Sequence, residues 1–148
     1  MIDQDALAFF NALSGKLKIE LTEPAQQVAP HLLNLVAPKG ARIVRVDLEL
    51  EVFEDDDARP LTEEEWSRVV VRAPRIKMVS LDTPETVVET PAPHGGVFTV
   101  RDLQHAIART EHASREDGEW MGGVDVHHVY FEGIELEDGG VWAIGWGS

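Results

Sequence analysis

Residues 42–54 alternate between apolar and charged side chains with a strictness that favours one kind of structure. The apolar side chains occupy every second position: Val44, Val46, Leu48, Leu50 and Val52. The positions between them carry mainly charged side chains: Arg45, Asp47, Glu49 and Glu51. Successive side chains of an extended chain leave opposite faces. The pattern therefore predicts a strand with one face in the core and the other in water.

Two helical patterns can cover the buried face of such a sheet. The longer runs from Val100 to about Arg115 and begins at a capping pair, Thr99 with Asp102. The shorter lies near the amino terminus, where Asp3 or Asp5 can cap it. We expect its inward side to hold Ala6, Phe9, Phe10 and Leu13, with Gly15 ending it in a left-handed conformation.

Short β-rich runs predict the rest of the sheet. They are residues 16–21, 68–72, 76–81, 86–90, 124–137 and 141–146. The turn residues between 68 and 90 predict an antiparallel meander, and Asp138-Gly139-Gly140 predicts a hairpin between the last two runs. A capping box of Thr62 with Glu65 predicts a short helix carrying Trp66. The fold class is α+β, a mainly antiparallel sheet of about five to seven strands packed against two helices.

Composition bounds the number of domains and the kinds of partner. The 148 residues, 43% of them hydrophobic, suit a single domain covering 1–148. With 27 acidic and 13 basic residues, the formal net charge is −14, which opposes binding to nucleic acid. The sequence contains no cysteine and no long apolar run. We therefore expect a cytoplasmic protein with no membrane segment and no cofactor.

Adjacent histidines near the carboxyl terminus are candidates for metal binding or proton transfer. If residues 124–131 are extended, His127 and His128 leave opposite faces, and only one of them can face a given site. A metal site with fewer histidines would use Asp125 and His127 together with His94 or a helix residue, and Glu132 would be a possible base. Glu132 would share a face with His128, so this enzyme alternative requires a bulge or twist in the strand.

The string from Gly122 through His127, His128 and Glu132 to Gly139 resembles part of the first cupin motif. In that family two histidines and a glutamate hold a metal inside a β-barrel. The family separates its two histidines by one residue, so that both point inward, whereas here they are adjacent. We therefore assign no family from this string.

A row of cationic side chains is predicted along one side of the main helix. Arg101, His105, Arg109 and His112 follow one another by four, four and three residues. This basic ridge could receive a carboxylate, a phosphate or an acidic partner. The alternative is a solvated helix face whose charges are satisfied by Glu111, Glu116 or the sheet edge.

The final segment is rich in aromatic residues and glycine. Trp142, Ile144 and Trp146 share one strand face and are first of all core candidates. Gly145 and Gly147 leave bare backbone beside those rings, which could seat a flat ligand or a partner's aromatic side chain. Trp120 precedes a glycine pair and could act as a lid.

An acidic tract runs from Asp47 to Glu65, where nineteen residues hold ten acids and a single base, Arg59. The run Asp55-Asp56-Asp57 lacks the spacing and the glycine of an EF-hand loop, which excludes that type of calcium site. The tract is explained by solubility and protection of a sheet edge. Alternatively, it steers a basic protein onto this surface.

Taken together, these patterns predict a non-catalytic binding module for an unidentified protein or small-molecule ligand. Its predicted surface combines the aromatic hairpin with the basic ridge. The predicted ligand-binding residues are Arg101, His105, Arg109, His112, Trp120, His127, His128, Tyr130, Trp142 and Trp146. The alternatives are the metal-assisted enzyme and an acidic, immunity-type protein that binds a basic partner.

Overall fold

The computed structural model describes residues 1–22, 42–80, 83–117 and 125–148. Its helices are α1 (Gln4–Asn11), α2 (Glu63–Trp66) and α3 (Val100–Asp117). Its strands are β1 (Ser14–Leu21), β2 (Ile43–Glu54), β3 (Asp57–Pro60), β4 (Val69–Arg72), β5 (Arg75–Ser80), β6 (Thr83–Pro91), β7 (Val97–Thr99), β8 (Tyr130–Leu136) and β9 (Val141–Gly147). The predicted α+β class is confirmed.

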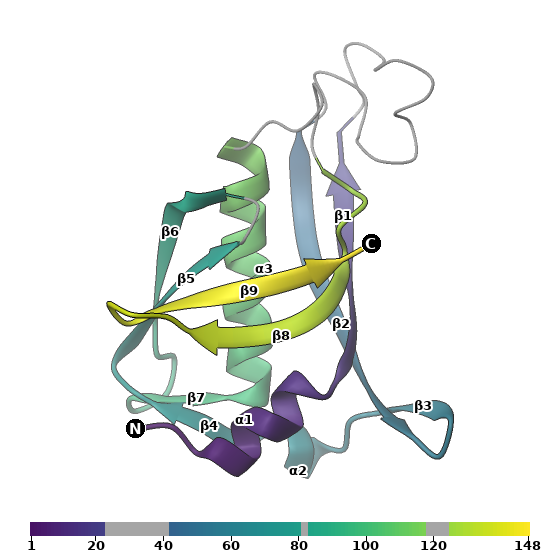
Figure 1. Ribbon diagram of the computed structural model, residues 1–148, viewed down its shortest axis with the longest axis vertical. Coiled ribbons are helices and arrows are strands. Elements are labelled where there is room, and N and C mark those ends of the chain that lie inside the picture. Colours follow the sequence, from purple (N-terminus) through teal and green to yellow (C-terminus); the bar gives the residue numbers. More distant parts are fainter. Residues whose placement is uncertain (23–41, 81–82, 118–124) are drawn as a thin grey trace.

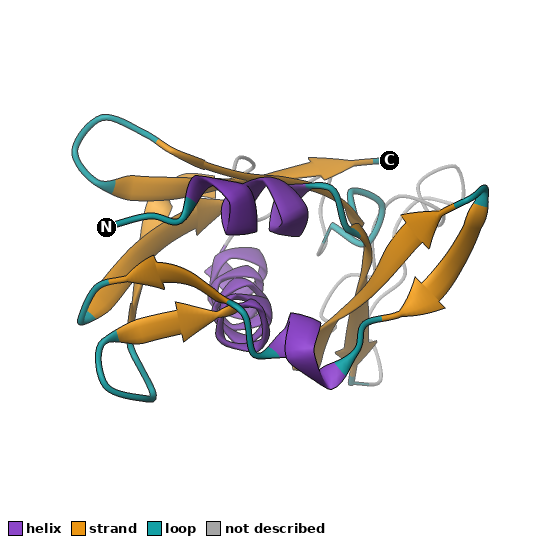
Figure 2. Cartoon of the chain, turned by 90° about the horizontal axis from the view of Figure 1, so that it is seen from below, coloured by secondary structure: helices purple, strands orange, loops and turns teal. Residues whose placement is uncertain are grey.

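Seven strands form one curved sheet in the order β3-β2-β1-β8-β9-β5-β6, and β4 pairs with β7 separately. All neighbours in the large sheet are antiparallel except β5 and β9. The sheet curves around α3, which Figure 2 shows nearly end-on inside the curve. Apolar side chains of α3, including Leu103 and Ile107, are fully buried between helix and sheet. One side of the sheet therefore faces the helix, and we call the opposite side the outer side.

Strand β2 follows its predicted alternation from Val46 onward, where Leu48 and Leu50 are buried. Val44 was predicted to face the core, and this is wrong: its side chain is 52% exposed and Ile43 is buried instead. The pairing with β1 shifts at this point, so that Val44 is an extra residue on β2. This β-bulge exchanges the faces of the residues on either side of it.

Helix α1 is capped by the Asp3 side chain, which accepts a hydrogen bond from the Ala6 N–H at 3.0 Å. The prediction that Gly15 ends this helix is wrong, because the helix ends at Asn11, its C-cap Ala12 has a right-handed conformation, and Gly15 lies in β1. A Cβ at Gly15 would lie 2.8 Å from the Phe131 Cβ atom. Close packing against β8, rather than helix termination, therefore explains this glycine.

The predicted meander is correct only for the β5–β6 pair. Strand β4 pairs with β7 instead of β5, and β9 runs parallel to β5, which places the β8–β9 hairpin in the middle of the large sheet (Figure 1). The hairpin itself is confirmed: Glu137 donates to the Val141 carbonyl at 2.8 Å, and Gly139 and Gly140 have positive φ. The pairings of β4 and β9 join distant segments, which local turn signals do not encode.

Candidate functional site

The segment before β8 is a turn and not the predicted strand. Strand β8 begins at Tyr130, and the Asp125 carboxylate organises the residues before it. Its Oδ1 accepts from the N–H groups of His127 and His128 at 2.8 and 3.2 Å, and its Oδ2 lies 2.7 Å from the His128 Nδ1. An aspartate side chain that accepts hydrogen bonds from the next backbone N–H groups stabilises a turn, and these N–H groups are then not paired with a neighbouring strand.

The two imidazole rings consequently lie together, which corrects the prediction that they leave opposite faces. Their centroids are 5.2 Å apart and their planes make an angle of 69°. In the described parts of the chain, however, no three histidine or acidic side chains converge in a way that could hold a metal ion. Burial raises the pKa of Asp125, but the hydrogen bonds from His127 and His128 outweigh it and leave this pKa below its ordinary value. An ionised Asp125 is thus committed to holding the turn.

Arg115 clamps this turn to the carboxyl-terminal end of α3. Its guanidinium donates to the Asp125 carbonyl at 2.7 Å and to the His128 carbonyl at 2.5 Å. Its Nε lies 2.8 Å from Glu111 Oε1, one helical turn earlier. The guanidinium carbon also lies 5.6 Å from the centre of the Trp146 ring. One buried arginine therefore links α3, the turn and β9.

Glu111, predicted as a surface partner for the ridge, is completely buried. Its Oε1 accepts a hydrogen bond from the Ser80 Oγ at 3.2 Å. Neither Glu111 Oε2 nor Trp146 Nε1 has a hydrogen-bond partner among the described residues. Burial raises the pKa of Glu111 above its ordinary value, although Arg115 and the nearby Trp146 and Ser80 oppose the change.

The ridge residues lie on the side of α3 that faces away from its buried residues. Arg101 is already paired: it donates twice to Glu63, at 2.9 and 3.0 Å, and lies 5.4 Å from the centre of the Trp66 ring. His112 lies 3.9 Å from Glu116. His105 and Arg109 are exposed, and neither has a hydrogen bond or ion pair among the described residues.

The hairpin and the ridge do not form one surface. Trp142 is only 4% exposed and belongs to the core. Trp146 is half-buried against Phe131, with ring centroids 5.9 Å apart, and against Arg115. Tyr130 is 49% exposed on the outer side, beside Lys16. Because the tryptophans point toward α3 while the ridge lies on its far side, the helix separates the two predicted halves. Trp120 lies outside the described residues.

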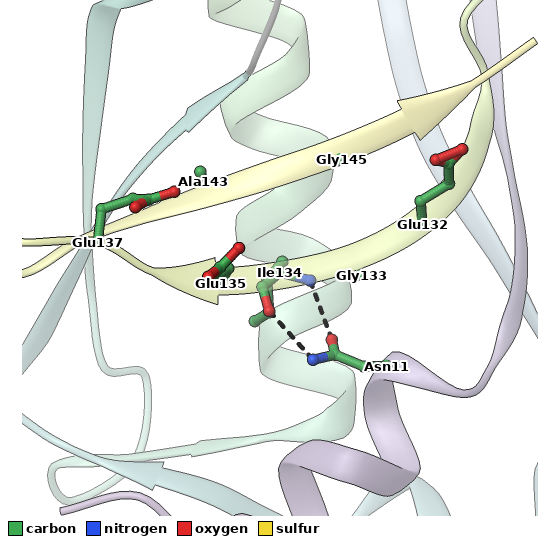
Figure 3. Close-up of a pocket in the computed structure, with 8 residues that line it drawn as sticks. All are labelled: Asn11, Glu132, Gly133, Ile134, Glu135, Glu137, Ala143 and Gly145. Atoms are coloured by element: carbon green, nitrogen blue, oxygen red, sulfur yellow. Dashed lines mark hydrogen bonds between the residues drawn. The ribbon is translucent and has the colours of Figure 1, made fainter.

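The outer side of the β8–β9 hairpin carries a depression that the sequence patterns did not predict (Figure 3). Its volume is about 440 Å³. We call it the acidic cup, and it is lined by Asn11, Glu132, Gly133, Ile134, Glu135, Glu137, Ala143 and Gly145. Small residues of β9 form its floor, since they alternate with the tryptophans that point inward. That alternation of tryptophan with alanine or glycine is the sequence signal that could have located it.

Three exposed glutamates from the β8 region border the floor of the acidic cup: Glu132, Glu135 and Glu137. Glu132 extends over β9, and a Cβ at Gly147 would meet its Oε1 at 2.5 Å. Glycine at 147 thus leaves room for this glutamate. The arrangement presents carboxylates around a depression whose floor is mainly bare backbone, which suits a cation carried on a slender apolar stem.

Comparison of the chain with protein-family models, curated proteins and solved structures finds no match. Within the described segments, no helix has the length and apolar character needed to cross a bilayer.

Proposed function

We propose that this protein is a non-catalytic binding module that recognises a basic partner through the acidic cup. One observation carries the proposal: a depression of about 440 Å³ has a floor of glycine and alanine and a border of three exposed glutamates. The proposal keeps the predicted binding module and takes the basic partner from the acidic-protein alternative, but it places the binding surface in the acidic cup instead of the tract from Asp47 to Glu65.

The shape and charge of the acidic cup favour a lysine or arginine side chain as its occupant. The stem of such a side chain can lie against the bare backbone of Gly145, while its charged end meets Glu132 or Glu135. Neighbouring carboxylates repel one another, and a bound cation would relieve that repulsion. The net charge of −14 would also accelerate encounter with a basic protein and disfavour a nucleic acid.

The experiment compares two variants that lose the same charge in different places. The cup variant carries Glu132→Gln, Glu135→Gln and Glu137→Gln. The control variant carries Asp5→Asn, Glu64→Gln and Glu85→Gln, three exposed positions that do not line the acidic cup. Binding of a hexa-arginine peptide is measured by calorimetry at low and moderate salt.

We expect the cup variant to lose about tenfold in affinity and the control variant to lose only a small fraction of that. Equal losses in the two variants would mean that overall charge, and not the acidic cup, attracts the peptide. Absence of binding to the unmodified protein would also contradict the proposal.

A further inference from the structure

The β2–β3 hairpin extends from the body of the molecule as an arm (Figures 1 and 2). We call residues 51–60 the acidic arm. Phe53 lies on it with 62% of its side chain exposed, opposite Ala58, whose methyl group cannot cover the ring. The turn that follows is made entirely of acids, from Glu54 to Asp57. A large aromatic ring is thus left in water within the most acidic part of the chain.

The position of Phe53 follows from the period of β2. Phe53 has the same parity as Glu49 and Glu51, which are exposed, whereas Leu48 and Leu50 face α3. The residues that share this side of β2 at positions 45, 47, 49 and 51 are all charged. Glu132 of the acidic cup also lies on the outer side, because its neighbour Phe131 is buried. The ring and the acidic cup therefore both belong to the side of the sheet that α3 does not cover.

The acidic arm is held at its base by Arg59. This arginine donates to both carboxylate oxygens of Glu65, at 2.9 and 3.1 Å, and to Glu54 at 3.4 Å. Glu65 is fixed in turn by the capping box with Thr62 at the start of α2. An arm anchored in this way is already ordered before a partner arrives, which reduces the entropy lost on binding.

The charge of the acidic arm determines which occupant suits it. Nucleic acid and anionic membranes carry the same sign as the arm and are repelled. Two arms from two copies of this chain would repel each other for the same reason. A basic polypeptide that also carries apolar side chains complements both the acids and the ring of Phe53.

We infer that the acidic arm is a second contact for the basic partner of the acidic cup, with Phe53 as its apolar anchor. This inference rests on the proposed function in one respect only, the basic character of the partner. Exposed aromatic residues that become buried at an interface are frequently the side chains on which affinity most depends.

The test uses two peptides that separate apolar contact from charge. One peptide alternates arginine and leucine, and the other is hexa-arginine. The variant is Phe53→Ser, and the matched control is Val87→Ser, which removes an apolar side chain that is 50% exposed on β6. Both sites are exposed, so thermal unfolding should change little in either variant.

We expect Phe53→Ser to weaken binding of the arginine–leucine peptide by about tenfold, with almost no effect on hexa-arginine. Val87→Ser should leave both affinities unchanged. Equal binding of the arginine–leucine peptide to Phe53→Ser and the unmodified protein would overturn the inference. So would sedimentation showing that Phe53 mediates self-association.

The two proposals can fail separately. Loss of hexa-arginine binding in the cup variant tests the acidic cup, whereas the arginine–leucine peptide with Phe53→Ser tests the acidic arm. If Phe53 matters while the cup glutamates do not, the arm stands as the binding surface and the cup is rejected.

Discussion

The side chain of Asn11 pairs with the backbone of Ile134 through both of its polar groups. Its Oδ1 accepts from the Ile134 N–H at 2.9 Å, and its Nδ2 donates to the Ile134 carbonyl at 3.0 Å (Figure 3). The register between β1 and β8 covers only Lys16 and Tyr130, so β1 does not supply these two hydrogen bonds. The carboxamide takes the place of a neighbouring strand and ties α1 to the acidic cup.

Replacing Asn11 with Ala should therefore lower the free energy of unfolding by about 1–3 kcal/mol, because two part-buried backbone groups lose their partners. Asn11→Asp should be at least as destabilising, since a carboxylate oxygen would face the Ile134 carbonyl. Urea unfolding gives the energies, and hydrogen exchange of the Ile134 amide gives the location. Unchanged exchange at Ile134 in Asn11→Ala would contradict this explanation.

Gly133 allows Asn11 to approach, and a comparison with Gly139 separates contact from backbone strain. The φ angles of Gly133 and Gly139 are +101° and +89°, so alanine is strained at both. A Cβ at Gly139 meets nothing within 4 Å, whereas one at Gly133 lies 3.2 Å from Asn11. We expect Gly139→Ala to cost about 1 kcal/mol and Gly133→Ala clearly more in urea unfolding. Equal costs would mean that the contact with Asn11 is unimportant.

The buried pair of Arg115 with Glu111 should respond asymmetrically to substitution. Arg115→Met leaves the Glu111 carboxylate and two backbone carbonyls without their donor, so we expect a loss of about 3–5 kcal/mol. The double variant Glu111→Leu/Arg115→Met removes the stranded charge as well and should be more stable than Arg115→Met alone. Denaturant unfolding of the single and double variants measures both values. A double variant less stable than the single one would show that the pair has another role.

The sequence could predict the elements whose signals are local. The alternation of β2 from Val46 to Leu50, the capping box at Thr62 and the extent of α3 all appear in the structure. Each depends on residues only a few positions apart, where periodicity and capping chemistry act directly. The exposed positions of His105 and Arg109 follow from the same helical period.

The parts of the fold and of the site that the sequence did not predict depend on contacts between distant segments. The sequence around Glu111 does not indicate that this residue is buried. Its partner Arg115 lies on the same helix, but its other partner, Ser80, comes from a distant strand. The turn at Asp125 replaces a strand that periodicity favoured, since its carboxylate finds two backbone donors and is clamped by Arg115. To predict the acidic cup, one would have to know that the small residues of β9 and the glutamates of β8 lie on the same outer side of the sheet. Pairing and face are tertiary properties that one strand alone does not specify.

Acid should loosen the base of the acidic arm. The hydrogen bonds from Arg59 hold the pKa of Glu65 at about 2, compared with its ordinary value of 4.5. A lowered pKa contributes stability that is present above pH 4.5 and is lost as the pH falls through about 2. We expect the protection of the β3 amides against exchange, measured relative to their intrinsic exchange rate at each pH, to fall across this range. Glu65→Gln, the matched control, should show the lower protection at all pH values, and a pH-independent protection in the unmodified protein would contradict the prediction.

Glu111 should give the opposite dependence on pH. Burial raises the pKa of Glu111 above 4.5, so between 4.5 and that higher value the folded protein keeps a proton that the unfolded chain has lost. The contribution of Glu111 to stability is therefore complete below pH 4.5 and declines as the pH rises through the folded pKa. Glu111→Gln cannot titrate and lacks this decline.

The measurement is the free energy of unfolding of both proteins from pH 4.5 upward. Other titrating groups, including Asp125, contribute similarly to each and largely cancel in the difference. The stability of the unmodified protein relative to Glu111→Gln should fall with rising pH, and a flat or rising difference would mean that burial does not raise the pKa of Glu111.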